Sequence, residues 1–141
     1  MVDAGRRVFT VVQVIACVIL LGIVAKWRGP WNLARYVGTV LVVIGMAGIA
    51  TARVQLGRAF SLTAQARQLV THGIYSKIRN PIYVSGLVMF LGFILVLQIP
   101  ELWLAWVAIA VMQTVRARRE ARVLEAAFGD AYREYRCKTW F

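Results

Sequence analysis

The stretch "NPIYVSGLVMFLGFILVLQIPELWLAWVAIAVMQTVRARRE" (residues 80–120) contains two apolar runs joined by a short connection. Residues 82–100 carry no charged side chain, and residues 102–115 include only two polar ones. Uncharged helical runs of about 17 residues or more fit the roughly 30 Å hydrocarbon core of a bilayer. The second run reaches that length when it begins near Ile99 or takes in the residues after Val115. Because the connection "LQIPELW" is short, the two runs predict a hairpin of membrane-spanning helices.

Two earlier runs, residues 8–25 and 36–52, are also uncharged. Across the chain 60% of residues are hydrophobic and 16% are charged, which is little charge for a soluble domain. We therefore predict a single-domain, all-α integral membrane protein with four transmembrane helices. The predicted parts are transmembrane helices at about 8–25, 36–52, 82–99 and 101–116, a cytoplasmic loop at 53–81, and a cytoplasmic tail with helices at 117–141.

A secretory signal peptide is the competing interpretation of residues 1–25, because Arg6 and Arg7 precede an apolar run there. No small-x-small cleavage site stands out at the end of the run, and the run is long for a signal core. Both observations favour a retained first membrane helix.

The positive charge is placed asymmetrically. Lysine and arginine number 17 against 6 acidic residues, which gives a net charge of +11. With four spans, both termini lie on the same side as the 53–81 loop, and that side holds 14 of the 17 cations. The positive-inside rule then predicts a multi-pass protein with both termini in the cytoplasm. The same surface suits anionic lipid headgroups, and because membrane orientation accounts for the charge, nucleic-acid binding is not predicted.

Helix-packing signals are concentrated in the second run, which carries Gly38, Gly45 and Gly48, with Gly48 and Ala52 at small-xxx-small spacing. Such positions permit close approach of two helices. Packing inside one bundle explains them better than a dimer face, so we expect a monomer.

Residues for metal and nucleophilic chemistry are scarce. His72 is the sole histidine, and the sequence has no metal-binding cluster, nucleophile elbow or P-loop. Cys17 and Cys137 lie in different environments, so no disulfide is predicted. No acidic residue falls inside a predicted span, which argues against a proton-coupled exporter and against a cation channel with a carboxylate ring.

The loop ends in a rigid polar corner, "GIYSKIRNPIYVSG" (residues 73–86). Pro81 fits the first turn of the third helix and biases Asn80 away from helical geometry, so Asn80 is presented at the start of that helix. Arg79 precedes it, and Tyr75 and Tyr83 flank the corner. Tyr83 alone could equally be a tyrosine of the membrane-interface belt.

The tail "RARREARVLEAAFGDAYREY" begins at Arg116 and predicts a helix that continues out of the membrane. Arg116 and Glu120 are four residues apart and share one face. Arg116 could equally be a membrane-exit anchor, and Glu120 its solvated partner. Gly129 is a candidate helix end, and Asp130 a candidate start for a second short helix.

Two segments resemble one family. "QLGRAFSLTAQARQLVTHGIYSKIRNPIYVSGLVMFLG" (55–92) resembles the signature of the isoprenylcysteine carboxyl methyltransferases: an LGR-aromatic-Ser segment, Leu-Val-x-x-Gly-x-Tyr, and Arg-His/Asn-Pro-x-Tyr entering a membrane helix. "RARREARVLEAAFGDAYREYRCKTW" (116–140) is similar to its second signature of Arg, Glu-Glu, Leu, Phe-Gly and Tyr-x-x-Tyr. The two cover about half of the chain, and phospholipid N-methyltransferases are distant relatives with a similar ending.

The resemblance implies an integral membrane enzyme that uses S-adenosylmethionine, with a cytoplasmic cofactor pocket between residues 73–87 and the tail helix. A lipophilic acceptor, most simply a carboxylate of isoprenylcysteine type, would enter from the bilayer. Methyl transfer from a sulfonium needs no metal; the enzyme aligns the two reactants and excludes water. The matching cofactor-binding positions are Tyr75, Arg79, Asn80, Pro81, Tyr83 and Glu120, and the matching catalytic positions are Arg116 and Glu120.

The chain departs from the family at two positions. The usual Glu-Glu pair is Glu120-Ala121, so one carboxylate is missing, and Asn80 stands where a histidine is often found. An asparagine is no general base, so Asn80 is expected to hydrogen-bond the cofactor. A lipid amine or thiol acceptor would use the same donor geometry. Ala121 favours the other class of function, a non-catalytic membrane scaffold or transporter that kept the fold.

Overall fold

The structure is a computed structural model that describes residues 15, 18–19, 21–26, 29–56 and 69–141. Cys17, most of the predicted first span (8–25) and residues 57–68 of the loop lie outside the described residues, and the predictions made for them stay predictions.

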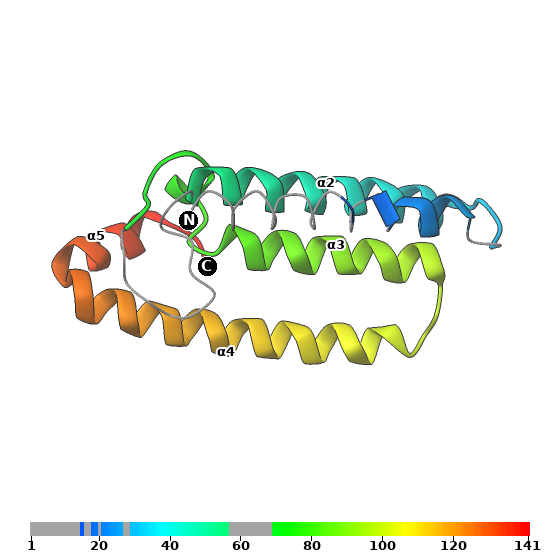
Figure 1. Cartoon of the computed structure of the whole chain (residues 1–141). Coiled ribbons are helices and arrows are strands. Elements are labelled where there is room, and N and C mark those ends of the chain that lie inside the picture. The colour runs from blue at the N-terminus through cyan, green and yellow to red at the C-terminus, as the bar shows by residue number, and fades with distance from the viewer. Residues whose placement is uncertain (1–14, 16–17, 20, 27–28, 57–68) are drawn as a thin grey trace.

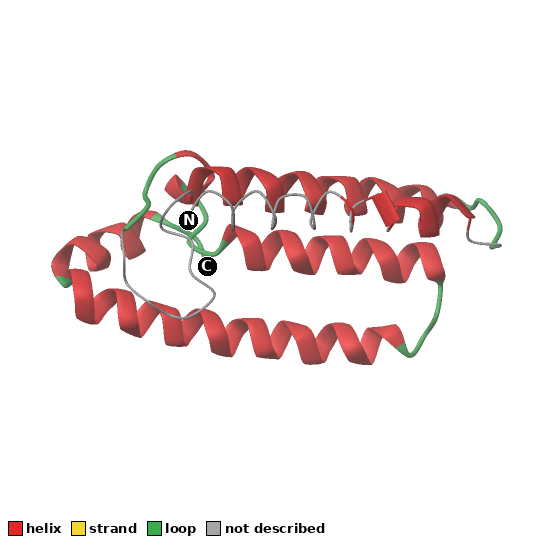
Figure 2. Cartoon of the chain, viewed as in Figure 1, coloured by secondary structure: helices red, strands yellow, loops and turns green. Residues whose placement is uncertain are grey.

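The described part of the chain is helical, and its sole β-type pairing is an isolated bridge between Ile78 and Trp140 (Figure 2). A short helical segment spans residues 21–26. After it come α2 (Leu33–Leu56), the 3₁₀ helix η2 (Gly73–Ser76), α3 (Pro81–Leu97), α4 (Leu102–Phe128) and α5 (Asp130–Lys138). The predicted all-α class is therefore confirmed.

The three long helices lie side by side in alternating directions, with α3 between α2 and α4 (Figure 1). The short connection at 98–101 turns the chain from α3 into α4, so the structure has the hairpin that the sequence predicts. The two neighbours of α3 pack against it to different extents: α2 packs along much of α3, whereas α4 touches α3 at fewer points. One of these is the Trp106 indole, which donates a hydrogen bond to the Leu87 carbonyl at 3.0 Å.

Of the described helices, α2 is the one long and apolar enough to cross a membrane by length and composition. The apolar helix α3 is shorter, at 17 residues, and α4 is apolar only in its first half, because arginines begin at Arg116. The four predicted spans are thus not confirmed; α2 is one candidate span, and the other three stay predictions.

Glycines set the contact between α2 and α3, as their spacing predicted. A Cβ atom at Gly38 would lie 2.6 Å from the Gly92 carbonyl oxygen, and one at Gly45 would lie 2.6 Å from the Met89 backbone nitrogen. Real Cβ atoms need well over 3 Å, so the two backbones can approach this closely only because side chains are absent. The glycine face of α2 is therefore used inside the chain.

The helix of the fourth apolar run continues past Arg116 into the tail, as the sequence predicts. The tail helix is the second half of α4, which ends at Phe128; Gly129 then takes a positive φ of 51° and α5 begins at Asp130. The prediction of a helix end at Gly129 and a new start at Asp130 is confirmed. The reversal at Gly129 returns α5 toward the beginning of α3, so the corner and the tail gather at one end of the helices (Figure 1).

Candidate functional site

The corner that precedes α3 is a compact turn. Gly73 opens η2 with a positive φ of 62°, and a Cβ atom there would overlap the Gln55 side chain from α2. Gln55 Oε1 accepts a hydrogen bond from the Ile74 backbone N–H at 2.7 Å. Pro81 is the first residue of α3, as predicted, and Asn80 precedes it with φ −121° and ψ 58°. Asn80 is thus outside the helical region, which a following proline disfavours.

Two tyrosines, one from the corner and one from α5, connect these two segments. Tyr75 is 6% exposed, and its backbone carbonyl accepts a hydrogen bond from the Tyr135 hydroxyl at 2.7 Å. Burial raises the pKa of Tyr75 well above its usual range and raises that of Tyr135 to about 12. Both hydroxyls therefore keep their protons to higher pH than an exposed tyrosine, and Tyr135 keeps the proton that its hydrogen bond needs.

The last two residues run alongside the corner. Trp140 donates its backbone N–H to the Lys77 carbonyl at 2.7 Å and accepts from the Arg79 N–H at 3.0 Å. The Phe141 carbonyl oxygen accepts two hydrogen bonds from Asn80, at 3.1 Å from the backbone N–H and 3.2 Å from Nδ2. Sequence reasoning missed this pairing, because three of its four hydrogen bonds join backbone groups, which leave no side-chain signal.

Three predicted site residues meet between α3 and α4. The Tyr83 hydroxyl donates a hydrogen bond to Glu120 Oε1, and the same oxygen lies 3.4 Å from Arg116 Nε. The Arg116 guanidinium also lies over the Tyr83 ring, 5.7 Å from its centre. Arg116 and Glu120 therefore lie on one face of α4, as predicted, and both contact Tyr83 of the corner.

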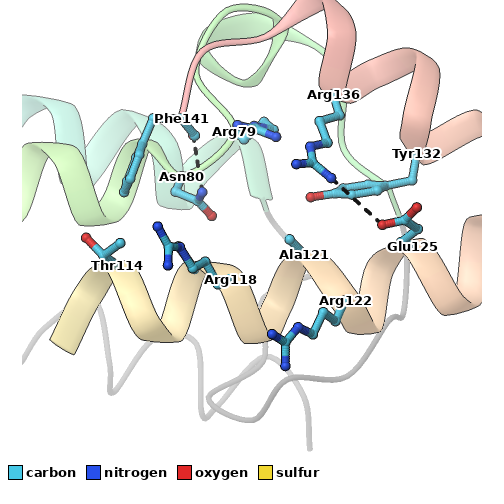
Figure 3. Close-up of a pocket in the computed structure, with 11 residues that line it drawn as sticks. Arg79, Asn80, Thr114, Arg118, Ala121, Arg122, Glu125, Tyr132, Arg136 and Phe141 are labelled. Carbon is cyan, nitrogen blue, oxygen red and sulfur yellow. Dashed lines mark hydrogen bonds and ion pairs between the residues drawn. The ribbon is translucent and has the colours of Figure 1, made fainter. Parts of the chain in front are cut away.

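A pocket of about 490 Å³ opens along α4, lined by residues of α4 other than Arg116 and Glu120; Figure 3 shows the side chains that line it. Two predicted site residues, Arg79 and Asn80, line it. The other predicted positions, Tyr75, Pro81, Tyr83, Arg116 and Glu120, are not among its lining residues. The full lining is Arg79, Asn80, Thr114, Ala117, Arg118, Ala121, Arg122, Glu125, Tyr132, Arg136 and Phe141.

The pocket wall is strongly basic, with four arginines against one acidic side chain, that of Glu125. Glu125 Oε1 is 3.0 Å from Arg133 Nε, and Glu125 Oε2 is 4.0 Å from Arg136 Nη1. Tyr132, which is 2% exposed, lies in the same wall. Burial raises the pKa of Tyr132, and the nearby cations Arg79 and Arg136 oppose that shift.

Within the described residues there is no group of three or more histidine, cysteine or acidic side chains that could hold a metal ion. Cys137 is an exposed free thiol. What the site offers is therefore a small-molecule pocket with many hydrogen-bond donors, one carboxylate, and aromatic rings from Tyr132 and Phe141.

The sequence of the chain matches known proteins. Residues 33–131, from the start of α2 to the start of α5, match the family described as phospholipid methyltransferase. The cobalt-zinc-cadmium resistance protein CzcN of Cupriavidus metallidurans is 31% identical over 118 residues, covering 82% of this chain and 52% of that protein. The chain thus spans about half the length of this curated relative. No solved structure matches the chain.

Proposed function

Because the chain belongs to the phospholipid methyltransferase family, we propose that it transfers a methyl group from S-adenosylmethionine to a lipophilic acceptor held in the membrane. The observation that carries this proposal is the pocket of about 490 Å³ between the proline corner and the tail helices. It lies between the two segments that the resemblance names, but of the predicted cofactor-binding residues only Arg79 and Asn80 line it.

The pocket residues fit such a cofactor. Small-molecule sites commonly have volumes of about 300–1,000 Å³, and this pocket lies in that range. Arg79 Nε is buried and has no hydrogen-bond partner in the described part of the chain, so a ligand group with an acceptor oxygen would satisfy it. The Glu125 carboxylate suits a cationic group, and the aromatic rings of Tyr132 and Phe141 suit a nucleoside or a sulfonium.

Methyl transfer requires the protein mainly to position the methyl donor and the acceptor. When bound, the cofactor supplies an electrophilic methyl group on sulfur, which the acceptor attacks in line. Asn80 and Arg79 hold the ligand from the corner, and Phe141 covers the pocket where Asn80 binds its carbonyl. Arg116 and Glu120, which the resemblance gives as catalytic positions, do not line the pocket; through Tyr83 they position the corner against α4. Such alignment can lower a barrier by several kcal/mol.

A carboxylate of isoprenylcysteine type is the acceptor that we favour. A carboxylate is already a nucleophile at neutral pH, so no general base is needed, and Arg118 and Arg122 place cations where it would bind. The family description favours a second candidate, the amine of a phospholipid headgroup. An ammonium must first lose a proton, so that reaction would need a base.

We place the site at the cytoplasmic face of a multi-pass, monomeric protein with both termini in the cytoplasm. The corner, the second half of α4 and α5 lie at one end of the helices (Figure 1), and the arginines of the tail belong to these two helices. The acceptor would reach this end from the bilayer. The same arginines would hold the end against anionic lipid headgroups.

Binding separates this proposal from a non-catalytic scaffold or transporter. Isothermal titration of the protein in detergent with S-adenosylhomocysteine should give saturable binding, because the pocket has the volume of a small-molecule site and its wall carries Glu125 and Arg136 for charged groups of the ligand. Absence of binding to the intact, folded protein supports the scaffold. Asn80→Ala should weaken binding, since it removes a polar group of the pocket wall.

Turnover identifies the acceptor class. The purified protein is incubated with methyl-labelled S-adenosylmethionine and either a total membrane lipid extract or a prenylated cysteine, and products are identified by mass spectrometry. Base-labile label indicates a methyl ester, and base-stable label in phospholipid indicates N-methylation. Failure to label any lipid or prenylated cysteine substrate, in a protein that binds the cofactor, refutes the proposed reaction.

A further inference from the structure

Glu125 and Arg136 place opposite charges side by side on the pocket wall, although they come from different helices. Glu125 belongs to α4 and Arg136 to α5. Their closest atoms, Oε2 and Nη1, are 4.0 Å apart, at the outer limit of an ion pair. Their side chains are 34% and 59% exposed. Figure 3 shows both at the same end of the pocket, on either side of Tyr132.

Both groups keep hydrogen-bonding capacity beyond this long contact. A carboxylate offers about four lone-pair sites, and a guanidinium offers five N–H donors. Glu125 uses Oε1 for its 3.0 Å contact with Arg133, which does not line the pocket. That contact fixes the Glu125 side chain from outside and leaves Oε2 on the side of Arg136. A ligand can therefore bind both groups without breaking the closer ion pair.

A carboxylate and a guanidinium about 4 Å apart are complementary to a zwitterion. An α-amino-acid group carries an ammonium and a carboxylate on neighbouring atoms. Placed with its ammonium at Glu125 and its carboxylate at Arg136, it sets every charge next to an opposite one, and charge-assisted hydrogen bonds are the strong ones. A group with one charge would satisfy one partner and be repelled by the other.

We propose that Glu125 and Arg136 bind the α-amino-acid end of the methyl donor. This rests on the proposed function and deepens it, because it orients the cofactor within the pocket. Glu125 supplies the carboxylate of the pocket, and Ala121, one turn earlier on the same side of α4, leaves room beside it. The nucleoside end then extends toward Asn80 and Phe141, at the other end of the pocket in Figure 3.

Two ligands test this orientation. S-adenosylhomocysteine carries the amino-acid group, and 5′-methylthioadenosine has the same nucleoside and sulfur without it. Both are titrated calorimetrically into wild-type protein, Glu125→Gln and Arg136→Gln. Each variant should bind S-adenosylhomocysteine at least about tenfold more weakly, as expected for loss of a hydrogen bond between charged groups. Affinity for 5′-methylthioadenosine should stay at the wild-type value.

Arg133→Gln is the matched control. It breaks the 3.0 Å ion pair of Glu125 but removes no pocket-lining residue. If Glu125 served only to hold α5 through Arg133, then Arg133→Gln and Glu125→Gln would weaken binding equally, and the inference would be wrong. Thermal unfolding of each variant, measured in parallel, separates loss of binding from loss of fold.

The remaining outcomes are distinct. Wild-type protein that binds neither ligand overturns the proposed function and this inference together. Wild-type protein that binds S-adenosylhomocysteine, with both glutamine variants at wild-type affinity, overturns the inference alone. Equal weakening of both ligands also overturns it, because Glu125 would then contact the nucleoside.

Discussion

Replacing Tyr83 by phenylalanine tests how the corner is held against α4. The substitution removes the hydroxyl that donates to Glu120 Oε1 and keeps the ring that Arg116 lies over. A hydrogen bond to a charged group contributes about 1.5–3 kcal/mol, and the 28% exposure of the Glu120 side chain favours the lower end. We expect the free energy of unfolding to fall by about 1.5 kcal/mol, which for a chain of this size lowers the midpoint of thermal unfolding by about 5 °C.

The functional consequence follows from the position of Tyr83 in the first turn of α3, three residues after the pocket residue Asn80. Loosening this turn should weaken S-adenosylhomocysteine binding several-fold without removing any atom of the pocket wall. Glu120→Gln should have a similar effect, because it weakens the same hydrogen bond.

A double-mutant cycle decides between bracing and direct contact with the cofactor. If Glu120 acts by bracing the corner, the double variant of Tyr83→Phe and Glu120→Gln is little worse than either single one, with a coupling energy of about 1 kcal/mol. Strictly additive losses, or a Tyr83→Phe protein with wild-type stability and affinity, would refute this reasoning. The control is Glu134→Gln, which breaks an exposed ion pair with Lys138 and should change little.

Three further outcomes are expected. Gly45→Ala should be about 1–3 kcal/mol less stable than Gly86→Ala in thermal unfolding, because its Cβ would lie 2.6 Å from the backbone of α3 whereas Gly86 has open space. The free energy of unfolding should fall as pH rises from about 10 toward 12, because the pKa of Tyr135 is near 10 in the unfolded chain and about 12 in the folded one. Tyr135→Phe should reduce this pH dependence in unfolding measurements. It should also be less stable at neutral pH, because it loses the hydrogen bond to the Tyr75 carbonyl. Gly73→Ala should weaken S-adenosylhomocysteine binding, since it strains a residue with φ 62° that positions the corner.

The sequence predicts those features that depend on backbone restrictions. Pro81 has a fixed φ and restricts Asn80, so the start of α3 follows from two residues. Gly129 is the kind of residue that can reverse a chain at a helix end, and α5 begins immediately after it. The close packing of α2 on α3 likewise follows from glycine spacing. Each of these is a local rule that the rest of the chain does not override.

The pocket wall could not be predicted in the same way. The tail sequence offers polar residues on most faces of α4, and the resemblance selects the face of Arg116 and Glu120. In the structure Tyr83 occupies that face, and the pocket lies beside Ala121 and Glu125. Which face of a helix meets a neighbour depends on where the neighbour is placed, and that is set here by Gly129 and by contacts far apart in the chain. The pairing of residues 140 and 141 with the corner was not predicted, because backbone groups make all of its hydrogen bonds except the one from Asn80 Nδ2.

The position of Glu125 weakens the argument that Ala121 indicates a loss of activity. From the sequence, the missing second glutamate favours a chain that has lost activity, because a cationic cofactor needs a nearby carboxylate. Ala121 does line the pocket, but so does Glu125, one helical turn further along α4, where Arg133 holds it from outside. The pocket therefore has a carboxylate one turn away from the usual position, and a loss of activity no longer follows from Ala121. In a Glu125→Gln background, Ala121→Glu should then recover part of the lost S-adenosylhomocysteine affinity, and no recovery would mean that the two positions are not equivalent for the ligand.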